Sequence, residues 1–236
     1  MSDSVIIIPT YNEIENIEKM TRKVMSLDKD YHVLYVDDSS PDGTADAIRL
    51  LQEEFSGKIH LEVRKGKLGL GTAYIHGFKW AIEKKYDFIF EMDCDFSHDP
   101  DDLIRLYDAC VDGADVSIGS RYCKGGKVSN WPLKRVLMSY FASVYVRMIL
   151  WVGIKDTTAG FKCYRRKVLE KINLDGITFK GYAFQICMKY AAKKHGYKIT
   201  EVPITFIDRE FGQSKMNTGI FKEAFFGVWK MRKMDL

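Results

Sequence analysis

The chain has 236 residues, enough for one large hydrophobic core or two small domains, and 46% of them are hydrophobic. Its 36 basic and 32 acidic residues nearly balance, so the charge gives no indication of a nucleic-acid-binding protein. The five cysteines are scattered and include no Cys-x-x-Cys pair, which argues against a disulfide framework or a zinc site and fits a reducing compartment.

The sequence shows no segment suited to export or to crossing a membrane. No basic residues precede the short apolar run at 5–8, so we expect no signal peptide. The longest apolar stretch, 136–154, contains Arg147 near its middle, where a charge would be costly in lipid. We therefore expect no transmembrane domain, and we expect this stretch to form one long, mostly buried helix that could touch a membrane surface.

Strands and helices alternate through the first half of the chain. Apolar runs predict strands at 4–8, 33–36 and 88–93, and segments in which apolar residues recur predict further strands at 59–63 and 116–119. Apolar residues at helical spacing predict helices between the strands, at 13–25, 45–55 and 67–85, and Pro100 is placed to open another. This alternation indicates an α/β protein with a mostly parallel central sheet flanked by helices.

The second half is less regular, but its sequence contains no linker. Helices are predicted from about 132, at 182–194 and at 218–231. Residues 161–164 predict a short strand, and residues 199–207 predict a pair of strands or one strand bent around Pro203. We therefore expect a single domain that spans residues 1–236.

Two carboxylates, Asp93 and Asp95, follow a strand that is predicted to be buried. Open α/β sheets bind ligands at the carboxyl ends of their strands, and carboxylate oxygens suit a hard divalent cation, which usually arrives with phosphates. The pattern favours a metal–diphosphate site. The alternative is an acidic loop that only caps the following helix.

Polar clusters follow other predicted strands as well, at 10–13, 37–38 and 120–121. Parallel strands end at the same edge of a sheet, so we expect these clusters to converge with the carboxylate pair. An acid pair after the second strand commonly binds a ribose or a base. The alternative for Asp38 is that it stabilises the turn that follows it.

Several basic residues are candidates for binding an anionic substrate. Guanidinium groups match phosphate geometry, so Arg121, Lys134 and Arg135 could bind a phosphate, although the last two could instead be the solvated start of a helix. Arg209 and Lys215 lie in a polar, glycine-containing segment, which is typical either of a loop that closes over a ligand or of a solvated loop. The five histidines show no metal-ligand spacing, and we assign none of them a catalytic role.

Three segments together resemble family 2 glycosyltransferases of the GT-A fold, namely 8–13 (IPTYNE), 36–44 (VDDSSPDGT) and 92–98 (MDCDFSH). Three more are similar to the dolichol-phosphate mannose synthases within that family, namely 67–77 (KLGLGTAYIHG), 181–185 (GYAFQ) and 201–209 (EVPITFIDR). The segments occur in order and cover nearly the whole chain, which makes the resemblance more specific than any one motif. It implies a polyprenyl-phosphate β-D-mannosyltransferase catalytic domain.

The resemblance implies roles for particular residues. Catalysis would depend on Asp93, Asp95 and Arg121. Asp93 and Asp95 would hold Mg²⁺ or Mn²⁺, with Asp95 as the principal ligand. Arg121 would contact the acceptor or donor phosphate, beside the candidates Lys134 and Arg135. The nucleotide sugar would be bound by Pro9, Tyr11, Glu13, Val36, Asp38, Asp93, Cys94, Asp95, Arg209 and Lys215.

Two residues depart from the pattern that the resemblance implies. Cys94 stands where a small residue such as Ala is usual, and Ser97 stands where some members offer Gln as a further metal contact. A serine could reach a metal ion through a water molecule, so this change bears on metal affinity rather than on the need for a metal.

The implied reaction moves mannose from GDP-mannose to a polyprenyl monophosphate with inversion. The second pKa of a phosphate monoester is about 6, so the acceptor is already an anionic nucleophile at neutral pH and needs no general base. The alternatives are another sugar donor such as glucose, another acceptor, or a non-catalytic nucleotide-sugar-binding subunit. A lipid acceptor also implies a cytoplasmic protein, peripheral at the cytoplasmic face of a membrane, that docks directly or through a membrane-anchoring partner.

Overall fold

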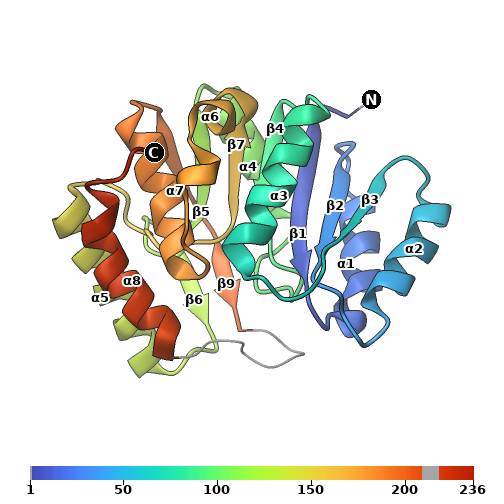
Figure 1. Ribbon diagram of the computed structural model, residues 1–236, viewed down its shortest axis with the longest axis horizontal. Coiled ribbons are helices and arrows are strands. Elements are labelled where there is room, and N and C mark those ends of the chain that lie inside the picture. The colour runs from blue at the N-terminus through green and yellow to red at the C-terminus, as the bar shows by residue number, and fades with distance from the viewer. Residues whose placement is uncertain (1, 209–217) are drawn as a thin grey trace.

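The computed structural model describes residues 2–208 and 218–236 (Figure 1). Its central sheet is built from β1 Ser4–Thr10, β2 His32–Asp37, β3 Ile59–Val63, β4 Phe88–Glu91, β5 Val116–Ser120, β7 Lys162–Arg165 and β8 Ile199–Pro203. The seven strands lie in the order β3-β2-β1-β4-β7-β5-β8. The strands predicted in the first half are confirmed, each within two residues of its predicted bounds, because apolar residues recur along each of them.

Within this sheet, β7 runs against both of its neighbours, and the other described pairs are parallel. Its Cys163 lies opposite Phe90 of β4 on one side and Ser117 of β5 on the other. Since β7 is antiparallel to both, β4 and β5 run in the same direction. The prediction of a mostly parallel sheet is confirmed, and β1, β2, β4 and β5 all end at one edge.

The predicted strand or strand pair at 199–207 consists of two strands that belong to different sheets. β8 ends at Pro203, and β9 Thr205–Ile207 pairs with β6 Lys127–Ser129 in a separate parallel ribbon. Proline has no N–H group to continue a sheet ladder, which explains why the chain leaves the central sheet at this residue.

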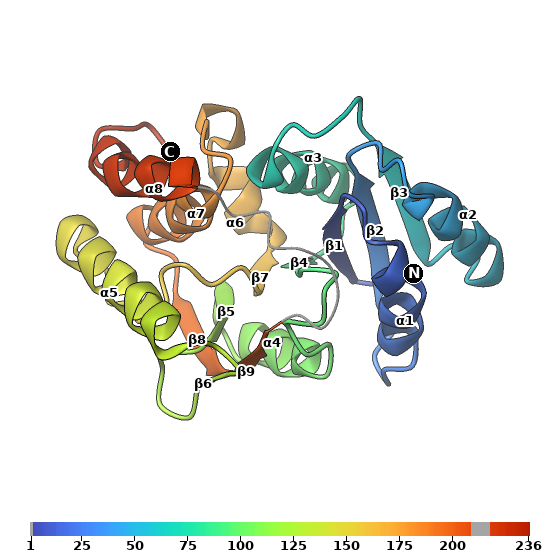
Figure 2. The ribbon, with the colours of Figure 1, turned by 90° about the horizontal axis from the view of Figure 1, so that it is seen from below.

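Helices cover both faces of the central sheet (Figure 2). Side chains alternate along β1, so Ile6 and Ile8 pack in one core while Val5 and Ile7 pack in the other. The first core lies under α1 Ile14–Met25, α2 Thr44–Glu54 and α4 Asp102–Val111. The second lies under α3 Leu70–Glu83, α6 Arg166–Lys171 and α7 Tyr182–Lys194.

Two further helices, α5 Leu133–Leu150 and α8 Thr218–Met231, pack side by side at one end of the molecule (Figures 1 and 2). The ring of Tyr145 stacks on that of Phe225 with 4.8 Å between centroids. Trp229 donates from Nε1 to the Tyr145 hydroxyl over 3.0 Å. These contacts join α5 to the carboxyl-terminal helix rather than to the sheet.

The expectation that α5 is mostly buried is wrong. Of its 18 residues, only Ser143, Val146 and Leu150 are buried. Large apolar side chains of α5 and of the residue after it are exposed, including Leu133, Leu137, Met138, Phe141, Met148 and Trp151. The helix lies beyond the edge of the sheet, so only a narrow strip of it meets the core. Among the described residues, no helix combines the length and the apolar character needed to cross a bilayer.

Candidate active site

The predicted polar clusters converge at the edge where β1, β2, β4 and β5 end, which faces the viewer in Figure 2. At the first strand end, the backbone N–H of Glu13 donates to Thr44 Oγ1 over 3.0 Å. The Lys67 ammonium lies 4.5 Å from the centroid of the Tyr11 ring. The loop that carries Tyr11 and Glu13 is therefore held between the start of α2 and the loop before α3, beside the edge.

The two acids after β2 have different surroundings. Asp37 is fully buried and accepts hydrogen bonds from Thr10 Oγ1 at 2.8 Å and Ser40 Oγ at 2.6 Å. Asp38 pairs with Arg64, whose Nε and Nη2 lie 2.7 Å and 2.5 Å from Oδ1. The turn-stabilising role that was the alternative for Asp38 thus belongs to Asp37. The Asp38–Arg64 pair was missed, although Arg64 directly follows the predicted third strand.

Three other predicted nucleotide-binding residues, Val36, Cys94 and Pro9, differ in how far their side chains are exposed. Val36 is fully buried in the core and Cys94 is 3% exposed, so both side chains pack inside the protein. Pro9 is partly exposed at the end of β1, opposite Val36. Val36 and Cys94 could therefore contact a ligand chiefly through their backbone.

Asp93 and Asp95 lie in the turn after β4. Asp95 is 8% exposed, and its Oδ1 accepts from the backbone N–H of Ser97 at 3.1 Å and from Ser97 Oγ at 2.6 Å. Phe96 between them has a φ of 57°, a left-handed conformation that a non-glycine residue seldom adopts. The hydroxyl of Tyr74 lies 3.4 Å from Asp93 Oδ1, and burial raises the pKa of Tyr74 well above its ordinary value, so Tyr74 remains a donor.

His98 supports the same turn, a role that the sequence did not indicate. Its Nδ1 accepts a hydrogen bond from the backbone N–H of Asp93 over 3.3 Å, and its ring stacks on Phe161. Burial lowers the pKa of His98 to about 4, so the ring is neutral at pH 7 and Nδ1 can accept. The position of this histidine in the same turn as the carboxylates is the feature that could have indicated this role.

The carboxylate pair fits a cation that arrives with a diphosphate better than it fits a closed protein cage. Within residues 2–208 and 218–236, no three His, Cys, Asp or Glu side chains gather closely enough to hold a metal ion. Magnesium-type ions are often bound by one or two carboxylates, with substrate phosphates and water completing their six ligands. Asp93 and Asp95 could supply such a donor set.

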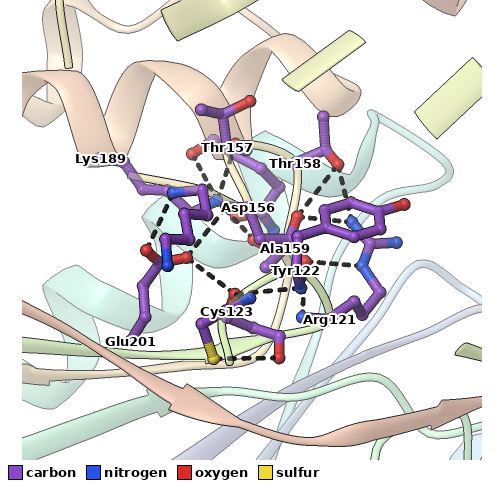
Figure 3. A network of polar contacts seen from close by, with 12 residues as sticks. Arg121, Tyr122, Cys123, Asp156, Thr157, Thr158, Ala159, Lys189 and Glu201 are labelled. Atoms are coloured by element: carbon purple, nitrogen blue, oxygen red, sulfur yellow. Dashed lines mark hydrogen bonds and ion pairs between the residues drawn. The ribbon is translucent and has the colours of Figure 1, made fainter. Parts of the chain in front are cut away.

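Arg121 lies just after β5, where its guanidinium is bound by Asp156 (Figure 3). Its Nε lies 2.7 Å from Asp156 Oδ2 and its Nη2 lies 2.7 Å from Oδ1, and Nη2 also donates to Thr158 Oγ1 at 2.7 Å. Burial alone would raise the pKa of Asp156, but the charge and hydrogen bonds of Arg121 outweigh it and hold that pKa below its ordinary value. No pattern in the sequence indicated this buried ion pair.

The other predicted phosphate-binding residues divide into two groups. Arg135 pairs with Asp208 at 3.0 Å and lies 3.9 Å from the centroid of the Trp131 ring, and Arg121 lies 5.5 Å from the same centroid. The structure thus places Arg121 and Arg135 beside the ring of Trp131, while Lys134 is exposed on α5. Arg209, Lys215 and most of the predicted closing segment at 208–218 lie outside the described residues.

Comparison with known proteins identifies relatives along nearly the whole chain. It is 47% identical over 234 residues to a polyprenol monophosphomannose synthase of Mycolicibacterium smegmatis, which covers 97% of this chain and 87% of that protein. It is 46% identical over 222 residues to an undecaprenyl-phosphate mannosyltransferase of Micrococcus luteus, covering 94% and 90% of the two chains.

Solved structures share the fold at low sequence identity. A glucosyl-3-phosphoglycerate synthase from Mycobacterium tuberculosis, in complex with Mn²⁺, UDP and phosphoglyceric acid, matches with a TM-score of 0.70 at 15% identity over 98% of this chain and 79% of that one. A mannosyltransferase from Pyrobaculum calidifontis, in complex with GDP-Man and Mn²⁺, matches with a TM-score of 0.59 at 15% identity over 97% of this chain and 69% of that one.

The sequence profile described as Glycosyl transferase family 2 matches residues 5–173, and the chain belongs to that family.

Proposed function

We propose that this chain transfers mannose from GDP-mannose to a polyprenyl monophosphate, with inversion and with Mg²⁺ or Mn²⁺. The observation that carries the proposal is the 47% identity to a polyprenol monophosphomannose synthase over 97% of the chain. The structural neighbour with bound GDP-Man and Mn²⁺ supports the choice of donor and of a divalent cation.

Residues at different strand ends would bind different parts of the donor. Asp38 with Arg64, the loop carrying Tyr11 and Glu13, and the backbone near Pro9, Val36 and Cys94 would hold the guanosine. Asp93 and Asp95 would hold the cation against the diphosphate, and Arg209 and Lys215 would close over it. The cation, when bound, supplies a positive charge that stabilises the departing diphosphate.

Arg121, Arg135 and Lys134 would bind and orient the acceptor phosphate. Burial keeps Tyr74 protonated and His98 neutral at pH 7, and both contact the Asp93 turn. Neither is needed as a base, because a phosphate monoester with a second pKa of about 6 is already ionised. The chain's own residues would therefore act by position and charge rather than by proton transfer.

A donor-by-acceptor screen with the purified chain tests this function. We expect turnover with GDP-mannose and a polyprenyl phosphate, loss of turnover with EDTA, and recovery when excess Mg²⁺ or Mn²⁺ is added, because the diphosphate needs the cation. UDP-glucose and soluble sugar acceptors serve as controls. Preference for another donor or acceptor would replace the proposed substrates, and nucleotide-sugar binding without any turnover would indicate a binding subunit.

The acceptor lipid exposes only its phosphate, so we propose that the enzyme works peripherally at the cytoplasmic face of a membrane. The exposed apolar side chains of α5 and the residue Trp151, which is 85% exposed, would enter the lipid headgroup layer. Exposed basic residues lie at the start of α5 and the end of α8, namely Lys134, Lys230, Arg232 and Lys233. An apolar surface flanked by basic groups suits anionic lipid.

Liposome flotation tests this docking. We expect the chain to float with anionic vesicles at low salt and to be released at high salt, and Phe141→Asp to weaken flotation because it puts a charge into the apolar surface. Leu50→Asp, at an exposed leucine of α2, is the matched control. If the chain binds no vesicle yet is fully active on detergent-solubilised acceptor, a membrane-anchoring partner would recruit it instead.

A further inference from the structure

Lys189 of α7 is a buried lysine that no part of the proposed reaction uses. It is 1% exposed, and its Nζ donates to the carbonyl oxygens of Ala159 at 2.6 Å, Thr157 at 2.9 Å and Gln185 at 3.3 Å. Three carbonyl acceptors match the three N–H donors of an ammonium group, whereas a neutral amine has only two. No carboxylate among the described residues forms an ion pair with it at direct contact.

Two of these carbonyls belong to the segment 156–160, which we call the bridging segment. At its start, Asp156 binds Arg121 and donates its backbone N–H to Glu201 Oε1 over 2.9 Å (Figure 3). At its end, a Cβ built on Gly160 would lie 4.0 Å from Asp93 Oδ2 and 3.6 Å from His98 Cε1. One short segment therefore adjoins both the phosphate-binding arginine and the carboxylate turn.

A second connection leads from Lys189 to the end of β4 through Gln185, whose main-chain carbonyl accepts one of the Lys189 hydrogen bonds. Gln185, one turn earlier in α7, donates from Nε2 to Glu91 Oε2 over 2.8 Å, and Lys162 pairs with the same oxygen at 3.0 Å. Glu91 is the last residue of β4, two positions before Asp93. Lys189 thus contacts the bridging segment directly and the end of β4 through Gln185.

Burying an ammonium group is costly because its hydration is lost, and burial lowers the pKa of Lys189 well below its ordinary value. The three hydrogen bonds and the nearby charges of Asp156 and Glu91 offset part of that loss. A methionine would fill similar space without this cost. What methionine cannot do is hold two carbonyl groups of an irregular segment at fixed positions.

We propose that Lys189 is a positioning residue, which fixes the bridging segment so that Asp156 aligns Arg121 with the turn carrying Asp93 and Asp95. This inference rests on the proposed function for its kinetic part only. It predicts that loss of Lys189 disturbs the alignment of acceptor and donor sites while leaving donor binding nearly intact.

The test compares Lys189→Met with Lys194→Met in the full chain. Lys194 lies in the same helix and also donates to a main-chain carbonyl, that of Met234 at 2.8 Å, but is exposed. We expect Lys189→Met to lower kcat by about 10- to 100-fold, since small misplacements of reacting groups have effects of that size. The KM for GDP-mannose should stay within about twofold. Lys194→Met should match the wild type.

Hydrogen exchange provides a readout that needs no substrate. Lys189→Met should speed exchange at 156–160 and leave β1 to β3 unchanged. If Lys189→Met does not fold, Lys189→Gln, which retains two N–H donors, takes its place. Should the wild type prove inactive with every donor, the proposed function fails while the exchange result still decides the role of Lys189.

A double-variant comparison separates positioning from general stability. Combined with Asp156→Asn, Lys189→Met should lower kcat little beyond the more damaging single variant, because both act through one segment. Three results would each overturn the proposal: unchanged exchange at 156–160, exchange that rises equally across the whole chain, or, in an active wild type, a kcat within twofold of normal.

Discussion

Asp95→Ala is expected to lower the rate of mannosyl transfer at least ~100-fold, because the carboxylate positions the cation and the diphosphate together. Asp95→Asn should be nearly as inactive, although an amide oxygen could still accept the hydrogen bonds that Ser97 Oγ and N–H donate to Oδ1. The measurement is kcat and KM for GDP-mannose at saturating Mg²⁺ and Mn²⁺. Turnover near the wild-type value in Asp95→Ala would refute the metal assignment.

Folding must be separated from chemistry for this variant. Removing the Asp95 carboxylate deletes two short hydrogen bonds in a buried turn, which typically costs about 1–3 kcal/mol of unfolding free energy. Asp95→Ala and Asp95→Asn should therefore remain folded by circular dichroism at assay temperature. Asp101→Ala is the control, because Asp101 is an exposed acid a few residues further on that pairs with Lys23. It should keep wild-type kinetics.

Most of the fold could be predicted because its signals are local. Recurring apolar residues predicted β1 to β5, and helical spacing predicted α7 and α8 with the bounds that the structure shows. The direction of β7 could not be predicted, since a strand of four residues carries no information about which neighbours it will pair with. The exposure of α5 was mispredicted for a related reason. An apolar composition is the same whether a helix faces a protein core or another apolar surface.

Site residues that directly follow a strand could be predicted, whereas ion pairs between residues far apart in the sequence were missed. Asp93 and Asp95 were found from their position after β4. Arg121 and Asp156 are 35 residues apart, and Asp38 and Arg64 are 26 apart. Local patterns cannot reveal such pairs, because they form only when segments far apart in the sequence meet in the folded chain.

Arg121→Ala is expected to impair both stability and catalysis. The sequence suggested a phosphate-binding arginine whose loss would harm catalysis more than folding. In the structure the Arg121 side chain is 8% exposed and the Asp156 side chain is fully buried, so removing Arg121 leaves a buried carboxylate without its main partner. Such losses typically cost about 3–5 kcal/mol of unfolding free energy. Chemical denaturation of Arg121→Ala should show a midpoint well below that of the wild type.

The matched controls isolate the ion pair. Arg105→Ala removes an arginine whose ion pair with Asp102 is partly exposed, and should cost only about 0–1 kcal/mol of unfolding free energy. Arg121→Ala combined with Asp156→Asn removes both charges, so it should recover part of the lost stability, although Asp156 also accepts the Arg121 backbone N–H at 3.0 Å. If Arg121→Ala unfolds at the wild-type midpoint, the buried pair does not contribute as the geometry predicts.

The double variant also decides whether Arg121 acts on the acceptor. Once its stability is partly restored, Arg121→Ala with Asp156→Asn should still have lost about 1.5–3 kcal/mol of transition-state stabilisation, since a charge-assisted contact to the acceptor phosphate is missing. That loss should appear in kcat/KM for the polyprenyl phosphate and leave the KM for GDP-mannose nearly unchanged. Asp156→Asn alone keeps the guanidinium and should retain more activity than the double variant. Equal activity of the two would mean that Arg121 only holds the bridging segment and does not bind the acceptor phosphate.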